Sequence, residues 1–358
     1  MAIVPLDVQA IIVEWVYRSS QHSSIDYPTL LACAIVCRAW TSLAQRLLFR
    51  RAPYASIYYS DPRNNATTTP FLRTLRAAPH LAAHVRFITL YIHPLYIDDN
   101  IFEVFKLCTN GSGIYVHISE DHRTEPFLAR LATTPMRPIF VSVDGNPKFA
   151  DSVINMWPSL RALDMFMWSS PAQMSEPPTG RMPHALYSLK TNAENVHCHW
   201  STPTAVAPAL RHLDLEDADW DSEVQCAALV ASGMLAQLHT LVLGSVGVPP
   251  QSMLEALAGL KTLVIGKLPE AACALPQGIW HLGYHYDHYN DLRDEVAHAQ
   301  LLLDAARGLS KLRLVTVTRK SSKKVLQEFE RACRNRGVDF VVYEEPACFP
   351  RPGNVDWI

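Results

Sequence analysis

The phrase WPSLRALDMFM at residues 157–167 recurs as APALRHLDLED at 207–217, LAQLHTLVLGS at 235–245 and LAGLKTLVIGK at 257–267. Each copy has the form L-x-x-L-x-φ, where φ is an apolar residue. Alternation of apolar side chains over this length is typical of a β-strand with one buried face. A strand repeated at intervals cannot bury that face alone, so the copies predict a stack of equivalent strands.

Looser copies of the phrase extend through most of the chain. Eleven candidate copies start at Val85, Gly113, Pro138, Leu160, Leu186, Leu210, Leu238, Leu260, Ile279, Leu312 and Val338. The intervals between them run from 19 to 33 residues. Most lie in the range of 20 to 29 residues that is typical of leucine-rich repeats. The only Asn in the place usual for such repeats is Asn192, which predicts an irregular solenoid.

Helical sequence lies between the predicted strands, at residues 125–134, 224–235, 251–260, 291–309 and 323–337. In the last of these, Val325, Phe329 and Cys333 are spaced by four and share one helix face. Alternating strands and helices predict an α/β fold, with parallel strands and the helices on the outer side. A doubly wound sheet is the competing architecture. It would need fewer strands, and no Gly-rich phosphate-binding turn follows any strand here.

The first fifty residues have a helical period instead. Val8, Ile11, Ile12, Trp15 and Val16 fall on one stripe and predict a helix over residues 5–17. A second helix is predicted to begin with Asp26 as its cap and Pro28 in its first turn, and to continue through Phe49. Together these helices carry more apolar surface than they can bury against each other. Part of that surface is therefore expected to meet another protein or the next domain.

Three short motifs occur within this segment. The segment opens with Pro5-Leu6-Asp7, has Val36-Cys37-Arg38-Ala39-Trp40 in its middle and closes with Leu47-Leu48-Phe49-Arg50. In these motifs residues 4–50 resemble an F-box, in the form common in fungal, basidiomycete-type F-box-like proteins. The resemblance implies a three-helix module that docks on the Skp-type adaptor of cullin–RING ubiquitin ligases. Carried over by position, the adaptor-binding face and its support would be Pro5, Leu6, Ile11, Ile12, Trp15, Leu31, Ile35, Val36, Trp40, Leu47 and Phe49.

The chain is therefore expected to have three parts. These are an F-box-like helical domain at 1–55, a leucine-rich-repeat-like solenoid at 56–345 and a C-terminal tail at 346–358. The implied function is that of a substrate-recognition subunit, which binds the adaptor, and through it a cullin, with the helices and an unknown target protein with the solenoid. The alternative is an interaction scaffold without ligase function, in which the first repeats would bury the helical face.

Polar and aromatic residues cluster where predicted strands end, as in HLGYHYDHYND at 281–291. Loops at strand ends are where a solenoid would recognise its target, and Tyr, Trp and His suit recognition. The candidate target-binding residues are Tyr284, His285, Tyr286, His288, Tyr289, His199, Trp200 and Trp220. A third hypothesis is an enzyme or metal protein that uses His281, His285, Asp287 and His288 as ligands. No Gly-x-Ser-x-Gly, P-loop or dinucleotide signature occurs, so we expect neither an enzyme nor a cofactor.

The composition excludes several classes of protein. Of 358 residues 49% are hydrophobic and 18% charged, which is too apolar for a disordered chain. The net charge of −2 argues against nucleic acid or an anionic membrane as the main partner. No apolar run is long enough to span a membrane, and the N-terminus lacks the positive region of a signal peptide. The eight cysteines contain no C-x-x-C pair, so we expect a cytoplasmic or nuclear protein.

Overall fold

The repeated phrase forms a strand at each of its eleven places in the computed structural model. The structure describes residues 5–19, 27–50, 68–92, 100–118, 124–144, 152–153, 155–166, 185–191, 208–215, 227, 229–243, 249–266, 275–285, 292–318 and 321–343. The chain divides into two compact units, residues 1–143 and 144–358. The predicted boundary at residue 55 and the predicted tail both lie outside the described residues, and that division stays a prediction.

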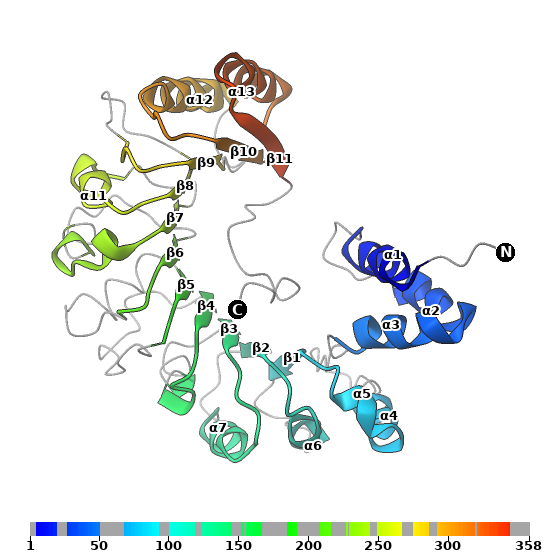
Figure 1. Cartoon of the computed structure of the whole chain (residues 1–358). Coiled ribbons are helices and arrows are strands. Elements are labelled where there is room, and N and C mark those ends of the chain that lie inside the picture. The colour runs from blue at the N-terminus through cyan, green and yellow to red at the C-terminus, as the bar shows by residue number, and fades with distance from the viewer. Residues whose placement is uncertain are drawn as a thin grey trace. The chain divides into compact units, whose positions relative to one another are not determined.

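In the first unit the strands are β1 (Phe87–Ile92), β2 (Gly113–Ile118) and β3 (Phe140–Asp144). In the second unit they are β4 (Ala162–Phe166), β5 (Ser188–Thr191), β6 (His212–Leu215), β7 (Thr240–Leu243), β8 (Thr262–Ile265), β9 (His281–Tyr284), β10 (Leu314–Thr318) and β11 (Asp339–Tyr343). Within each unit the spatial order of the strands follows their order in the chain, as Figure 1 shows for β4 to β11. A doubly wound sheet would reverse its strand order, so that alternative is wrong.

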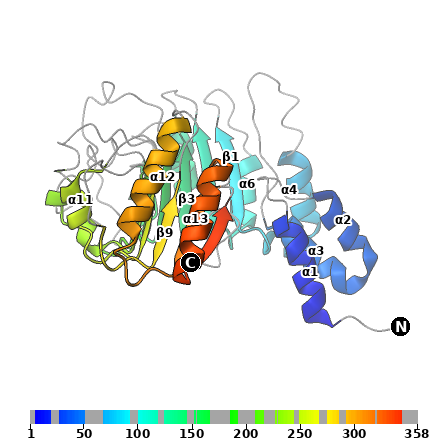
Figure 2. The same ribbon diagram turned by 90° about the horizontal axis from the view of Figure 1, so that it is seen from above.

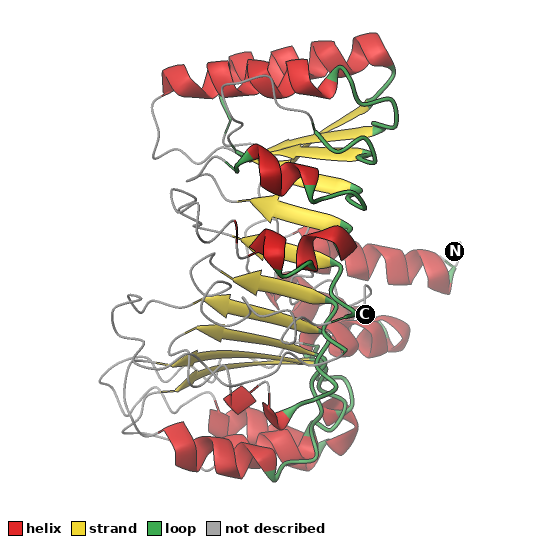
Figure 3. Ribbon diagram, turned by 90° about the vertical axis from the view of Figure 1, so that its left-hand side faces the viewer, coloured by secondary structure: helices red, strands yellow, loops and turns green. Residues whose placement is uncertain are grey.

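The strands pair in parallel, with equivalent positions of the phrase opposite each other. Leu189 of β5 lies opposite Leu213 of β6, which lies opposite Leu241 of β7. The first, fourth and sixth positions of the phrase are buried in these repeats. Burial of one such leucine stabilises the fold by about 1.5–3 kcal/mol. This architecture, viewed along another direction in Figure 3, resembles a leucine-rich-repeat solenoid.

The register corrects the starts of the second and eleventh copies. Asp339 of β11 pairs with Leu314, the third position of the tenth copy, so the eleventh copy starts at Gly337 and the predicted start at Val338 is wrong by one residue.

In the second copy Phe87 pairs with Gly113, so Gly113 occupies the third position of the phrase and Gly111 the first. The sequence pattern had placed the start at Gly113, because no leucine marks this copy. The buried Met136 side chain lies where a Cβ on Gly111 would stand, so it fills the space of the missing leucine.

Backbone hydrogen bonds tie the starts of successive strands together. The carbonyl of the residue before one strand accepts the N–H groups of two residues at the start of the next. The carbonyl of Tyr187, for example, accepts from Arg211 at 2.9 Å and from His212 at 3.0 Å. The same pattern begins in the first unit at Arg50, whose carbonyl accepts from Arg86 and Phe87. The end of the N-terminal helices is therefore joined to the first strand by the same bonds that join the repeats.

Helices occupy the predicted places between strands, on one side of the strands in each unit (Figures 1 and 2). They are α6 (Asn100–Leu107), α7 (Thr124–Ala132), α11 (Gln251–Glu255), α12 (Leu292–Ala306) and α13 (Lys323–Arg336). In α13 the side chains of Val325, Phe329 and Cys333 are buried, which confirms the predicted face. The helix predicted over 224–235 lies partly outside the described residues, and Met234–Gln237 forms the 3-10 turn η4.

The N-terminal segment forms three helices, α1 (Leu6–Ser19), α2 (Tyr27–Val36) and α3 (Arg38–Leu48), followed by α4 (Thr68–Ala77) and α5 (Pro79–Ala82). The residue pattern predicts one helix from Asp26 through Phe49, which is wrong, whereas the resemblance implies three helices in this segment. The chain is extended at Cys37, with φ −163° and ψ 165°, so α2 ends there and α3 begins. The Thr41 hydroxyl donates to the Ala34 carbonyl at 2.7 Å and joins α3 to α2 across this break.

A separate apolar core lies between α1, α2 and α3. It consists of the buried residues Val13, Leu30, Cys33, Ala44 and Leu47, with Ala34, Trp40, Leu43 and Leu48 packed against it. Among the described residues this core has five buried side chains, and the Thr41 hydroxyl adds a polar contact between α2 and α3.

Replacing Thr41 by Val should destabilise the junction between α2 and α3 at Cys37. The substitution keeps the shape of the side chain but removes the hydroxyl that donates to the Ala34 carbonyl. We expect this to cost about 1 kcal/mol, the usual net value of such a bond. Hydrogen exchange of α2 and α3 would detect it as faster exchange there with unchanged exchange in α13. Ser42→Ala, at an exposed neighbouring position, should leave the exchange unchanged.

Candidate functional site

Large apolar side chains are exposed on α1 and α2. On α2 the most open is Ile35, at 86% exposed, and on α1 it is Ile11, at 67%. Among the described side chains of these two helices, the exposed large apolar ones are Val8, Ile11, Ile12, Leu31, Ile35 and Val36. Positions 8, 11 and 12 form one stripe of α1, and positions 31 and 35 form one row of α2. The opposite sides of these helices supply Val13, Leu30 and Cys33 to the core, so both helices are apolar on two sides.

Five of these six side chains were among the predicted adaptor-binding residues, and the sixth, Val8, was assigned only to the helix stripe. Pro5 is also exposed. Leu47 is 2% exposed and belongs to the core, and Trp40 packs partly buried against the same core. Phe49 is half-buried and stacks on Phe71 of α4, with ring centroids 6.1 Å apart. The side chains of Leu6 and Trp15 lie outside the described residues.

The predicted adaptor-binding residues therefore fall into an exposed group on α1 and α2 and a packed group on and after α3. Leu31, Ile35 and Val36, together with Pro5, Ile11 and Ile12, present surface to solvent. Trp40, Leu47 and Phe49 instead hold α3 in place behind that surface. We define the α1–α2 face as the six exposed residues Val8, Ile11, Ile12, Leu31, Ile35 and Val36. Charged groups border it on α3, where Arg46 lies 3.6 Å from Glu14 of α1.

Two of the eight predicted target-binding residues lie in the described part of the chain. Tyr284 is 2% exposed, its hydroxyl donates to the Glu295 carbonyl at 3.1 Å, and its ring stacks on Phe329. A side chain in this environment supports the core between β9 and α13. His285 is half-buried directly after β9. The other six, His199, Trp200, Trp220, Tyr286, His288 and Tyr289, lie outside the described residues.

The side of the strands opposite the leucines carries two histidines, of which His281 belongs to the predicted metal-ligand set and His212 is not singled out by the sequence pattern. His212 and His281 occupy the third position of the phrase in β6 and β9. Burial lowers the pKa of His212 to about 4, and the nearby His239 ring acts in the same direction. Burial also lowers the pKa of His281 to about 4, and its Nε2 lies 3.1 Å from the Thr316 hydroxyl. Both imidazoles are therefore neutral at neutral pH.

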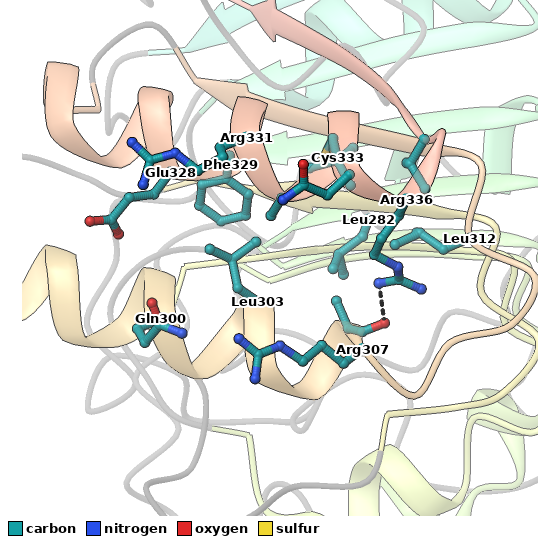
Figure 4. A pocket seen from close by; sticks show the side chains of 15 residues that line it. Leu282, Gln300, Leu303, Arg307, Leu312, Glu328, Phe329, Arg331, Cys333 and Arg336 are labelled. Carbon is teal, nitrogen blue, oxygen red and sulfur yellow. Dashed lines mark hydrogen bonds between the residues drawn. The ribbon is translucent and has the colours of Figure 1, made fainter.

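A cavity of about 510 Å³ lies beside α12 and α13 (Figure 4). Its lining includes the apolar side chains of Leu282, Leu303 and Phe329. The Arg336 guanidinium donates to the Ala306 carbonyl at 2.8 Å and the Leu309 carbonyl at 3.0 Å, which closes the end of α12. Burial raises the pKa of the Cys333 thiol to about 11, so the thiol is protonated and is a poor nucleophile at neutral pH.

Metal-ligating side chains do not gather in the part of the chain that the structure describes, where no group of three or more His, Cys, Asp or Glu residues could hold an ion. Asp287 and His288 of the metal hypothesis lie outside that part. In the same described ranges, no helix has both the length and the apolar character that a membrane crossing requires.

No protein-family model matches the sequence, and no curated protein matches it either. Among solved structures, an internalin from Listeria monocytogenes aligns over 74% of this chain and 69% of its own. The two are 12% identical, with a TM-score of 0.30. A similarity at this level does not bear on what the chain binds.

His212 and His281, both half-buried, should make the fold sensitive to acid. Below pH 6.5 they take up protons in the unfolded chain, but in the folded chain they do so only near pH 4. The free energy of unfolding should therefore fall as the pH falls from about 6.5 to about 4. Urea unfolding across this range would measure the slope.

The double variant His212→Gln/His281→Gln should show a shallower slope. His80→Gln, at an exposed position on α5, serves as its matched control and should keep the slope of the unmodified protein. An unchanged slope in the double variant would contradict the assignment.

Proposed function

We propose that this protein is the substrate-recognition subunit of a Skp–cullin–F-box ubiquitin ligase. The observation that carries the proposal is the α1–α2 face, six large apolar side chains exposed on two helices of one small module. Five of them occupy positions at which the resemblance to an F-box implies adaptor contact. A monomeric protein rarely exposes a cluster of large apolar side chains unless a partner covers it.

The chemistry of the face suits an adaptor. Interfaces gain most of their affinity from a few large apolar or aromatic anchors in a desolvated centre. Ile11, Leu31 and Ile35 are such anchors, since each projects from a helix whose other side is held by the core. Because that core and the Thr41 bond set the angle between α2 and α3, the anchors are held in place before binding. Preorganisation of this kind reduces the entropy lost on binding.

The repeats would supply the second half of the function. A stack of parallel strands exposes a continuous surface of neighbouring side chains, which repeat proteins use to bind other proteins. Docked through the α1–α2 face, the protein would hold a target close to the ubiquitin-loaded enzyme that the cullin recruits. Tethering raises the effective concentration of target lysines, so the subunit needs no catalytic group of its own. It would work in the cytoplasm or the nucleus.

An interaction scaffold without ligase function is the alternative. The repeat architecture by itself supports the scaffold alternative and the ligase proposal equally. The exposed state of Ile11 and Ile35 favours the first proposal, because the scaffold alternative requires the first repeats to bury this face.

Placing charge on the α1–α2 face should abolish adaptor binding. In Ile11→Asp/Ile35→Asp two anchors are lost, each worth about 1.5–3 kcal/mol of burial. We expect at least about a hundredfold weaker binding to a purified Skp-type adaptor, measured by calorimetry and by co-purification with a cullin. Leu47 is unsuited to this test, since a charge there would disrupt the core.

The matched control is Ser42→Asp/Val342→Asp, which adds the same charge at exposed positions on α3 and β11. It should bind the adaptor as the unmodified protein does. If the unmodified protein binds no Skp-type adaptor, the ligase proposal fails and the scaffold alternative stands.

A further inference from the structure

The residues that immediately precede the strands of the second unit form one continuous row. The backbone N–H of each residue in the row donates to the backbone carbonyl of the residue before it in the row. The first of these bonds runs from the Tyr187 N–H to the Arg161 carbonyl at 2.7 Å, and the last from the Arg313 N–H to the Trp280 carbonyl at 2.8 Å. We define the edge row as the seven residues joined by these bonds, Arg161, Tyr187, Arg211, His239, Lys261, Trp280 and Arg313. Because every member holds the same position before its strand, the seven side chains lie along one edge of the sheet.

The edge row is basic and aromatic, with no carboxylate. Four members are Arg or Lys, one is His239 and two are Tyr187 and Trp280. The whole chain has 34 Asp and Glu against 32 Lys and Arg, so its composition does not explain this row. Tyr187 is 44% exposed and Trp280 43%, and Arg161, Lys261 and Arg313 are exposed too. Before β11 the equivalent position is Val338, because Asp339 pairs with Leu314, so the basic run ends there.

Neighbouring members are close enough to affect each other. Partial burial and the charges of Lys261 and Arg211 together lower the pKa of His239. The Arg211 guanidinium donates to the carbonyls of Pro208 and Leu210, at 3.0 and 2.8 Å, so this cation is held in position. The two aromatic members pack against histidines of the strands. The Tyr187 ring centroid lies 4.7 Å from that of His212 in the neighbouring strand β6, and the Trp280 ring centroid lies 5.8 Å from that of His281 in β9.

The dimensions of the row suit an extended chain. Neighbouring strands are about 4.8 Å apart, so the six steps of the edge row cover about 29 Å. An extended peptide rises about 3.3 Å per residue and covers the same length with about nine residues. Nucleic acid would need a broader basic surface. Here Asp164 and Asp214 stand in the strands just beyond the row, and the sequence pI is about 6.7.

We propose that the edge row binds an extended acidic segment of a partner protein, with carboxylates on the cations and apolar groups on Tyr187 and Trp280. This rests on the proposed recognition role of the repeats, and it does not rest on adaptor docking. It names the chemical class of the target segment. Binding of this kind weakens as salt rises, because salt screens exposed charges.

The test is fluorescence anisotropy of the full-length chain with a fluorescein-labelled peptide of about ten glutamates, matched to the length of the row. The unmodified protein should bind this peptide, more weakly as salt rises, and should not bind a lysine peptide of the same length. Lys261→Glu/Arg313→Glu reverses two exposed members and should weaken binding by about tenfold or more. The matched control Lys323→Glu/Lys324→Glu makes the same reversal on exposed positions of α13 and should change the affinity less than about twofold.

Several outcomes would overturn the proposal. They are no binding of the glutamate peptide, equal weakening in both reversal variants, and tighter binding of oligothymidylate, which would assign the row to nucleic acid. The Ile11→Asp/Ile35→Asp variant should bind the peptide normally, and Lys261→Glu/Arg313→Glu should still bind the adaptor. Failure of the edge row and failure of adaptor docking are therefore seen in different variants and different assays.

Discussion

A single strand of this protein cannot bury its own leucines, and that constraint governs the rest of the structure. The leucine of one strand is covered by the equivalent leucines of its neighbours, as Leu213 is by Leu189 and Leu241. The strands must therefore run parallel, keep one register and follow chain order. The same register brings the residue before each strand next to its equivalent, where its carbonyl accepts two N–H groups from the next repeat. At the start of the stack there is no preceding strand in the pattern, and the Arg50 carbonyl at the end of α3 takes that role for β1.

The burial of one set of positions determines which others are left for function. Because side chains alternate across a strand, the positions between the leucines face the other side of the sheet, and in β7 and β8 they are buried too. His212 and His281 lie there, next to the edge row at the strand starts. The N-terminal helices obey a different period. Their core uses one side of α1 and α2 and leaves Ile11 and Ile35 in solvent. Two surfaces with different chemistry result, one apolar and helical, the other basic and aromatic along a sheet edge.

Most of the repeat fold could be predicted from sequence, because the spacing of the leucines follows directly from which strand positions are buried. All eleven predicted strand places are confirmed, and so is the buried face of α13. The wrong predictions lie where the local sequence pattern carries no signal. Gly111 has no side chain to mark the first position of its repeat, and Met136 from a later segment fills the space. The break at Cys37 lies inside an apolar stretch with helical period throughout. Across this break the Thr41 hydroxyl donates to the Ala34 carbonyl, a contact that no periodicity reveals.

The candidate sites, too, could be predicted only in part from the sequence. The sequence by itself determined that residues 5–50 carry more apolar surface than they can bury, and that the repeats stack. Only the tertiary structure decided which apolar residues are exposed. Ile35 and Leu47 look alike in a helical pattern, yet packing of α2 on α3 leaves one in solvent and encloses the other. Likewise Arg161, Arg211 and Arg313 are scattered in the chain, and parallel register alone gathers them at one edge. Burial and adjacency of this kind are properties of contacts between distant segments, so no local pattern encodes them.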